Sequence, residues 1–127
     1  MSDTLVIVVH GTPSKLLTVN AARRTHYMAK AKVSKAMRTV GWAAARELVG
    51  EGVRFAGSVR VTETVYWGKG ERSVDLDTIA PMCKPYLDGF TDAGVWVDDK
   101  QMVELTVRQE RASDGVGRVR IVVEGVS

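Results

Sequence analysis

The chain has 127 residues, of which 45% are hydrophobic and 26% are charged, and its formal net charge is +3. This size and composition predict one soluble globular domain over residues 1–127 with a single hydrophobic core. No apolar run approaches the ~18 residues of a membrane span, and the first residues lack the regions of a signal peptide. The only cysteine, Cys83, excludes an intrachain disulfide and, beside only two histidines, disfavours a zinc site. We therefore expect a cytoplasmic protein that does not enter a membrane.

The first half of the chain predicts a strand, a long helix and a second strand. The β-branched apolar run at residues 4–9 predicts a central strand, which residues 11–14 interrupt. A helix is predicted from about 26 to 49, and residues 53–67 predict a long strand. Apolar side chains recur close to every 3.6 positions of the helix, at Ala29, Val33, Ala36, Met37, Val40, Ala44 and Leu48.

The second half predicts one more helix and two final strands. A helix is predicted over residues 81–93 and ends at Gly94, a residue type that often ends helices. Residues 102–111 and 118–124 alternate like strands, and Asp114–Gly115 between them predicts a hairpin turn. The order β-α-β-α-β-β predicts an α+β sandwich, in which two helices pack on a mixed, mostly antiparallel sheet.

Positive charge is concentrated in the first third of the chain. From Lys15 to Arg46 there are eight basic residues and no acidic residue. A solvated helix face is one interpretation, but such faces usually mix both signs of charge. The pattern therefore favours a surface for a polyanion such as DNA. The residues predicted to contact DNA, including two in the loop after residue 67, are Arg23, Arg24, His26, Lys30, Lys32, Lys35, Arg38, Lys69 and Arg72.

Four aspartates in two short clusters suggest metal chemistry. Asp75 and Asp77 point to one face of an extended segment, where two carboxylates repel unless a cation lies between them. Asp98 and Asp99 are adjacent, so one can ligate a metal while the other caps a helix or faces solvent. Such oxygen ligands bind Mg²⁺ or Mn²⁺, which promote phosphodiester hydrolysis. Each pair alone is also typical of a solvated turn.

Lys84 lies between the two clusters, on the predicted second helix. A lysine near a phosphate can stabilise negative charge that develops during hydrolysis. The alternative is an exposed lysine that lays its methylene stem along the surface. Its neighbour Cys83 lies in an apolar context and is expected to be buried rather than nucleophilic.

The segment that joins the clusters resembles a known family. Asp75-Leu-Asp-Thr-Ile-Ala-Pro-Met-Cys-Lys-Pro-Tyr-Leu-Asp-Gly-Phe-Thr-Asp-Ala-Gly-Val-Trp-Val-Asp-Asp99 is similar to the signature of RusA-type Holliday junction resolvases. The resemblance covers residues 75–107 and continues more weakly at Thr12-Pro-Ser14, Asn20 and Arg24-Thr-His26. There are two departures from the family pattern. Thr78 stands where asparagine is usual, and the stretch from Asp77 to Lys84 is a few residues longer.

The resemblance implies an enzyme and assigns roles to its residues. Asp75, Asp77 and Asp99 match metal-binding acids, Lys84 matches a catalytic lysine, and Asp98 is an additional candidate ligand. The implied activity is a Mg²⁺-dependent endodeoxyribonuclease, with Mn²⁺ as the alternative ion. It would resolve four-way DNA junctions in recombination and repair by paired hydrolysis that leaves 5′-phosphate and 3′-hydroxyl ends. The family forms homodimers, and phages or prophages often encode its members, so the implied location is a bacterial or phage-infected host cytoplasm.

Two other functions stay open on the sequence. One is a different nuclease for branched or single-stranded DNA that uses the same metal site. The other is a non-catalytic DNA-binding protein whose aspartates are only turn residues. Substituting Asp75 with asparagine separates the second alternative from a nuclease, because only a nuclease would lose an activity.

Overall fold

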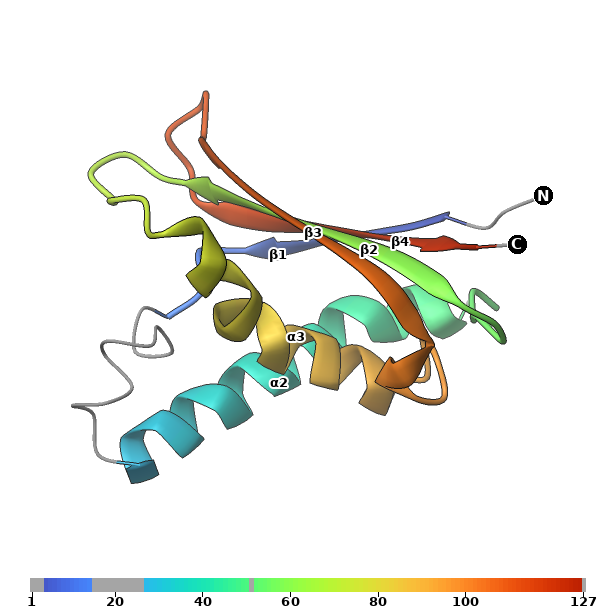
Figure 1. The fold of residues 1–127 in the computed structure, drawn as a ribbon. Helices are drawn as coiled ribbons and strands as arrows, with labels where there is room; N and C mark the ends of the chain where they lie inside the picture. Colours follow the sequence, from blue (N-terminus) through green and yellow to red (C-terminus); the bar gives the residue numbers. More distant parts are fainter. Residues whose placement is uncertain (1–3, 15–26, 51, 127) are drawn as a thin grey trace.

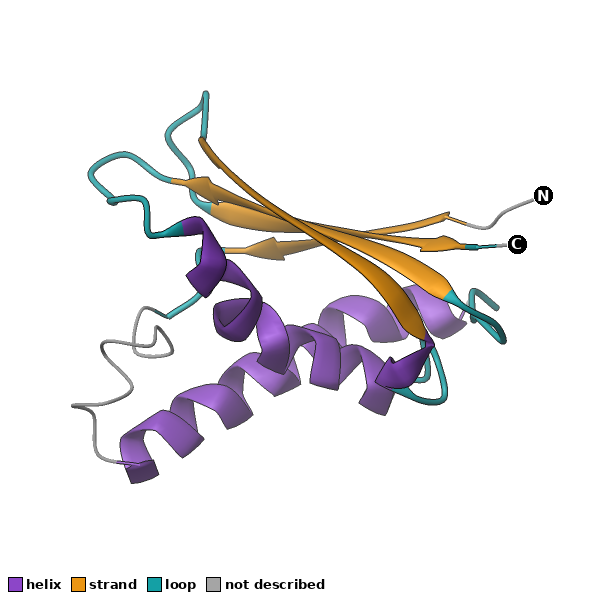
Figure 2. Cartoon of the chain, viewed as in Figure 1, coloured by secondary structure: helices purple, strands orange, loops and turns teal. Residues whose placement is uncertain are grey.

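A four-stranded mixed sheet with two helices on one face makes up the structure (Figures 1 and 2). The computed structural model describes residues 4–14, 27–50 and 52–126. The strands are β1 (Thr4–His10), β2 (Val59–Trp67), β3 (Met102–Arg111) and β4 (Arg118–Gly125). The helices are α2 (Tyr27–Gly50) and α3 (Ile79–Ala93), with short 3₁₀ turns η2 (Leu76–Thr78) and η3 (Asp99–Gln101). The order of elements confirms the predicted α+β sandwich.

The sheet order is β1-β4-β2-β3, so the predicted hairpin between the last two strands is wrong. The turn itself forms, and Gly115 donates a backbone hydrogen bond to Ala112 (3.1 Å). However, β4 pairs antiparallel with both β1 and β2, whereas β3 pairs only with β2. Burial agrees with the edge position of β3. Three apolar side chains of β4 are fully buried, while no residue of β3 is buried.

The two aspartate clusters lie at opposite ends of one crossover connection. β2 and β3 are parallel, and parallel neighbours cannot be joined by a tight turn. The chain therefore leaves β2, passes through η2, α3 and η3, and only then enters β3. Asp75 and Asp77 come before the helix of this connection, and Asp98 and Asp99 come after it.

The hydrophobic core fills the space between the sheet and the helices. The inward faces of β1, β2 and β4 supply alternating valine, leucine and isoleucine side chains, and α3 supplies Ile79, Met82 and Phe90. The helix α2 turns part of the predicted stripe inward: Met37 is buried, and Val33, Ala44 and Leu48 pack against the core. Ala45 and Val49, which were not in the stripe, are buried beside them. Ala29, Ala36 and Val40, three members of the predicted apolar stripe, are exposed instead.

Helices α2 and α3 touch backbone to backbone at two glycines. A β-carbon on Gly41 would lie 2.5 Å from the Tyr86 carbonyl oxygen, and one on Gly89 would collide with the Arg38 carbonyl oxygen. Only glycine fits at such a close helix crossing. This contact fixes the relative position of the two helices.

Two predicted boundaries moved, and one was confirmed. The strand predicted over 53–67 begins only at Val59, although Phe55 forms an isolated bridge with Trp96. The second helix begins at Ile79, and Gly94 ends it in the left-handed conformation with φ +86°. None of the helices in the described residues is long and apolar enough to cross a membrane.

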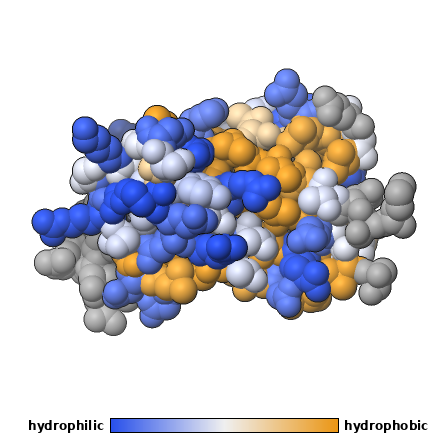
Figure 3. All heavy atoms as spheres, turned by 90° about the horizontal axis from the view of Figure 1, so that it is seen from above, coloured by the Kyte–Doolittle hydropathy of each residue, from blue (hydrophilic) through white to orange (hydrophobic). Residues whose placement is uncertain are grey.

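In the described part of the chain, no helix covers the second face of the sheet. Figure 3 looks onto this face and shows apolar side chains over the sheet with hydrophilic ones around them. Val6 and Val8 on β1 contribute to the face and are 43% and 42% exposed. The helices and the residues that they carry are therefore on the opposite side of the molecule from this surface.

Candidate active site and basic groove

Lys84 lies between two carboxylates in the structure. Its Nζ donates to Asp88 Oδ1 at 2.7 Å, one helical turn further along α3, and to Asp99 Oδ2 at 3.1 Å. The side chains of Lys84, Asp88 and Asp99 are 53%, 33% and 43% exposed. The cluster therefore joins residues far apart in sequence and is partly exposed to solvent.

The charges in this cluster reinforce one another. The hydrogen bond to Asp88 is the main cause that raises the pKa of Lys84, and Asp99 adds to it, while partial burial opposes both. The hydrogen bond from Lys84 is the main cause that lowers the pKa of Asp99, and a hydrogen bond with Asp98 adds to it. At neutral pH Lys84 is therefore an ammonium ion and Asp99 a carboxylate. Lys84 suits the role of a fixed positive charge and not that of a general base.

A capping box positions Asp99. The carboxylate of Asp98 accepts a hydrogen bond from the backbone N–H two residues later (2.8 Å), and the Gln101 side chain accepts from the Asp98 N–H (3.2 Å). The Gln101 amide also donates to the carbonyl oxygens of Phe55 (2.9 Å) and Gly57 (2.8 Å). The two adjacent acids thus take different roles, as their spacing predicts. Asp98 holds the backbone, and Asp99 faces Lys84.

Asp75 and Asp77 lie at the start of the crossover. The prediction that both lie in one extended segment is wrong. Asp75 is extended, but Asp77 lies inside the turn η2, and both side chains are exposed. Neither acid caps the helix with its side chain. Thr78, which stands where the family usually has asparagine, donates from its hydroxyl to the Asp75 carbonyl oxygen (2.7 Å) and closes the turn.

The predicted set of three metal ligands is not gathered in this structure. Within the described ranges 4–14, 27–50 and 52–126, no three His, Cys, Asp or Glu side chains are close enough to hold one metal ion. Asp77 precedes α3, whereas Asp99 comes after the helix and contacts Lys84, five residues after the first residue of α3. The positive charge between the carboxylates of Asp88 and Asp99 is the Lys84 ammonium itself. These residues as placed do not fit a site of Asp75, Asp77 and Asp99 around one ion.

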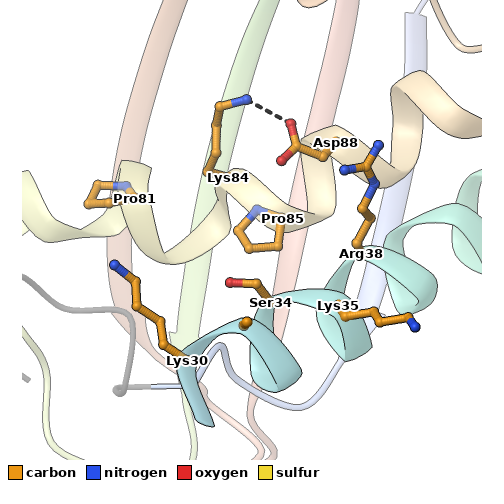
Figure 4. Close-up of a pocket in the computed structure, with 9 residues that line it drawn as sticks. Lys30, Ser34, Lys35, Arg38, Pro81, Lys84, Pro85 and Asp88 are labelled. Atoms are coloured by element: carbon orange, nitrogen blue, oxygen red, sulfur yellow. Dashed lines mark hydrogen bonds and ion pairs between the residues drawn. The ribbon is translucent and has the colours of Figure 1, made fainter. Parts of the chain in front are cut away.

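A groove between α2 and α3 adjoins Lys84 and has a volume of about 460 Å³ (Figure 4). In Figure 4 the Lys30 side chain reaches from α2 toward Pro81 on α3, and Arg38 lies near Asp88. Four cations and one acid line the groove, together with small and apolar residues. The lining residues are Lys30, Ala31, Ser34, Lys35, Arg38, Pro81, Lys84, Pro85 and Asp88.

The residues predicted to contact DNA are distributed over several parts of the structure. Arg23, Arg24 and His26 lie outside the described residues. Lys32 is exposed on α2 but does not line the groove, and Lys69 and Arg72 are exposed in the loop after β2. Three of the predicted residues, Lys30, Lys35 and Arg38, come together along the groove.

Arg38 differs from the two groove lysines because it has a strong acidic partner. It binds Asp92 on α3 through two hydrogen bonds of 2.5 and 2.8 Å, which raise the pKa of Arg38 and lower that of Asp92. Within the described part of the chain, neither Lys30 nor Lys35 forms an ion pair. These two lysines therefore carry most of the uncompensated positive charge of the groove.

Asp88 is a site residue that was not predicted from the sequence. Its spacing of four residues from Lys84 is the usual spacing of an ion pair on one helix face, and this signal could have identified it. Asp92, one turn later, contacts Arg38 on the other helix. No local pattern predicts that pairing, because it depends on how α2 and α3 cross.

Glu63 is a second residue that was not predicted from the sequence. It lies on the inward face of β2, is 0% exposed, and neither carboxylate oxygen has a hydrogen-bond partner among the described residues. Burial raises the pKa of Glu63 to about 8. Cys83 on α3 is buried as predicted, and burial, with a smaller contribution from Glu63, raises the pKa of its thiol. A thiol of this kind is not a nucleophile at neutral pH.

A scan against protein-family models gives no match for this chain, and a search of curated proteins finds no significant match.

Proposed function

We propose that this chain is a RusA-type, Mg²⁺-dependent endodeoxyribonuclease that resolves four-way DNA junctions. The observation that carries the proposal is the contact between Lys84 and Asp99 across 15 positions of sequence. The resemblance assigns catalysis to both residues, and a groove with four cations adjoins them. A backbone phosphate of DNA is the substrate group that suits this combination of charges.

In this proposal Lys84 offsets negative charge on the phosphate that is cut. Its ammonium is held in place by Asp88 and Asp99, so little reorganisation is needed when charge develops. The raised pKa keeps the group protonated throughout the reaction. Gln101 and Asp98 act on the reaction only through the position that they give to Asp99.

The Mg²⁺ requirement rests on the resemblance and on the carboxylate chemistry of the two clusters. Asp75, Asp77 and Asp99 do not surround one point in the described residues. Dependence on a divalent ion is therefore a separate prediction. Adding EDTA to the cleavage reaction tests it without any assumption about which acids bind the ion.

The experiment is cleavage of a synthetic four-way junction with Mg²⁺, with and without EDTA. Fork, flap and single-stranded DNA in parallel reactions distinguish a resolvase from another nuclease with the same site. The variants Asp99→Asn and Asp75→Asn should stop cleavage and leave DNA binding intact or stronger, because each removes a negative charge. Asp114→Asn, in the exposed turn before β4, is the matched control and should cut like the parent. Parent-like cleavage by Asp75→Asn would refute its assignment to the site.

A non-catalytic DNA-binding protein is the second candidate function. This function is favoured by the absence of a shared metal site for Asp75, Asp77 and Asp99 in the described residues. Aspartates that do not share a metal ion can be ordinary turn residues. This function predicts binding of branched DNA and no cleavage under any metal. The proposed homodimer is tested independently by light scattering of the purified chain.

A further inference from the structure

We propose that the groove between α2 and α3 binds the phosphodiester backbone of one DNA strand and leads it to Lys84. The inference rests on the proposed partner, DNA, and narrows where that partner lies. It assigns DNA binding to Lys30 and Lys35, which line the groove. Lys32, which is on the same helix outside the groove, should contribute less to the affinity for DNA.

The size of the groove suits part of a strand rather than a duplex. Its volume of about 460 Å³ lies within the ~300–1,000 Å³ range of sites for small ligands. A DNA duplex is too wide to enter such a space, but its backbone phosphates can reach it. The close contact of the helices at Gly41 and Gly89 holds the walls of the groove at a fixed spacing.

The charge of the groove suits an anion. Its lining carries four cations and one acid, and two of the cations, Arg38 and Lys84, are held by hydrogen bonds to α3 acids. Lys30 and Lys35 have no acidic partner in the described part of the chain. Each can therefore move to a phosphate without first breaking an ion pair.

Lys84 connects the groove to the candidate active site. It lines the groove and also contacts Asp99, so a strand lying in the groove places a phosphate beside the cluster. The apolar floor made by Pro81 and Pro85 offers no hydrogen-bond donors from its backbone nitrogens. Hydrogen bonds to a phosphate in the groove therefore come from the side chains, namely the cations and Ser34.

The test measures binding of a fluorescently labelled four-way junction by anisotropy, with EDTA present so that no strand is cut. The groove variant is Lys30→Ala with Lys35→Ala. The matched control is Arg46→Ala with Arg54→Ala, which also removes two positive charges. Arg46 lies eight residues after Arg38, about 12 Å along α2.

The groove variant should bind the junction on the order of 10- to 100-fold more weakly at 0.1 M salt. Each lost phosphate contact lowers by about 0.9 the slope of log binding constant against log salt concentration, and the variant loses two such contacts. The control pair should lose about threefold or less, because charges more than ~10 Å away are screened at that salt. Among single variants, Lys30→Ala should weaken binding more than Lys32→Ala. Equal losses from these two single variants, or from both double variants, would overturn the proposal.

Cleavage assays with Mg²⁺ separate this inference from the proposed function. Selective loss of binding by the groove variant, in a protein that never cuts DNA, would support the groove and refute the nuclease. Normal cleavage by the parent, with equal binding of DNA by both double variants, would support the nuclease and refute the groove. Inorganic phosphate is the last probe. If it binds the parent but not the groove variant, while DNA affinity is the same in both, the groove binds free phosphate and the proposal is wrong.

Discussion

Replacing Glu63 with glutamine should remove much of the pH dependence of folding stability. The carboxyl group lies at 0% exposure on the inward face of β2, and both its oxygens lack hydrogen-bond partners among the described residues. Burial raises its pKa from an ordinary value of 4.5 to about 8. The folded protein therefore keeps a proton on Glu63 in a pH range where the unfolded chain has lost it.

The sign and size of the effect follow from this difference in proton binding. Between pH 4.5 and about 8 the folded state binds more protons than the unfolded state, so the free energy of unfolding falls as pH rises. The stabilising contribution of the proton is fully present below pH 4.5 and is lost by about pH 8. The slope approaches about 1.4 kcal/mol per pH unit, so the loss from pH 5 to pH 7 is roughly 2 to 3 kcal/mol.

Urea unfolding at several pH values measures this loss. With an ordinary urea dependence of about 1–3 kcal/mol per M, the parent midpoint should fall by about 1 M or more between pH 5 and pH 7. Glu63→Gln keeps the shape of the side chain without its titration, so its stability should change much less over the same range. Glu63→Leu should be more stable than the parent, most clearly near pH 8.

Glu110→Gln is the control for this experiment, because Glu110 is an exposed glutamate on β3. Its pH dependence should follow that of the parent. If Glu63→Gln keeps the full pH slope of the parent, another group causes the slope, and Glu63 is not held protonated in the folded state.

Further substitutions test other contacts of the structure. Gly89→Ala should destabilise the protein by about 1–3 kcal/mol in thermal or urea unfolding, because its β-carbon would overlap the backbone of α2. Gly50→Ala, which has open space around it, should be neutral or slightly stabilising in the same assay. Asp88→Asn should lower the pKa of Lys84, measured by NMR titration, and should reduce junction cleavage more than junction binding. Gln101→Ala removes the support of η3 and should reduce cleavage with unchanged affinity for DNA, whereas parent-like turnover would show that Asp99 needs no such support.

The sequence predicted the local structure better than the long-range pairing. The end of the second helix at Gly94, the burial of Cys83 and the order of the elements were all predicted correctly. These features depend mainly on residues that are near one another in the sequence. The hairpin after Arg111 failed because the Asp-Gly turn is real but does not determine which strands pair. The inserted position of β4 comes from its pairing with β1 and β2, which lie far away in the sequence, and a short alternating segment does not reveal such partners.

The candidate site was predictable in part for similar reasons. The contact of Lys84 with Asp99 agrees with the order of the family-like segment. Whether Asp75, Asp77 and Asp99 gather depends on where the turns before and after α3 place them, and the pattern of aspartates carries no information on that placement. Glu63 was missed although the alternation carries the signal, because residue 63 shares the face of Val61 and Val65 in a strand of period two.

The two helices that border the groove run in the same direction, since Lys30 lies across from Pro81 and Arg38 pairs with Asp92 further along. Both helices therefore begin at the same end of the groove, as Figure 1 shows. The aligned peptide dipoles of each helix place a partial charge of about +0.5 at its start. These two backbone charges attract anions, and no side-chain substitution removes them. Even a chain without Lys30 and Lys35 should keep a weak, salt-sensitive attraction for phosphate at the end of the groove where both helices begin.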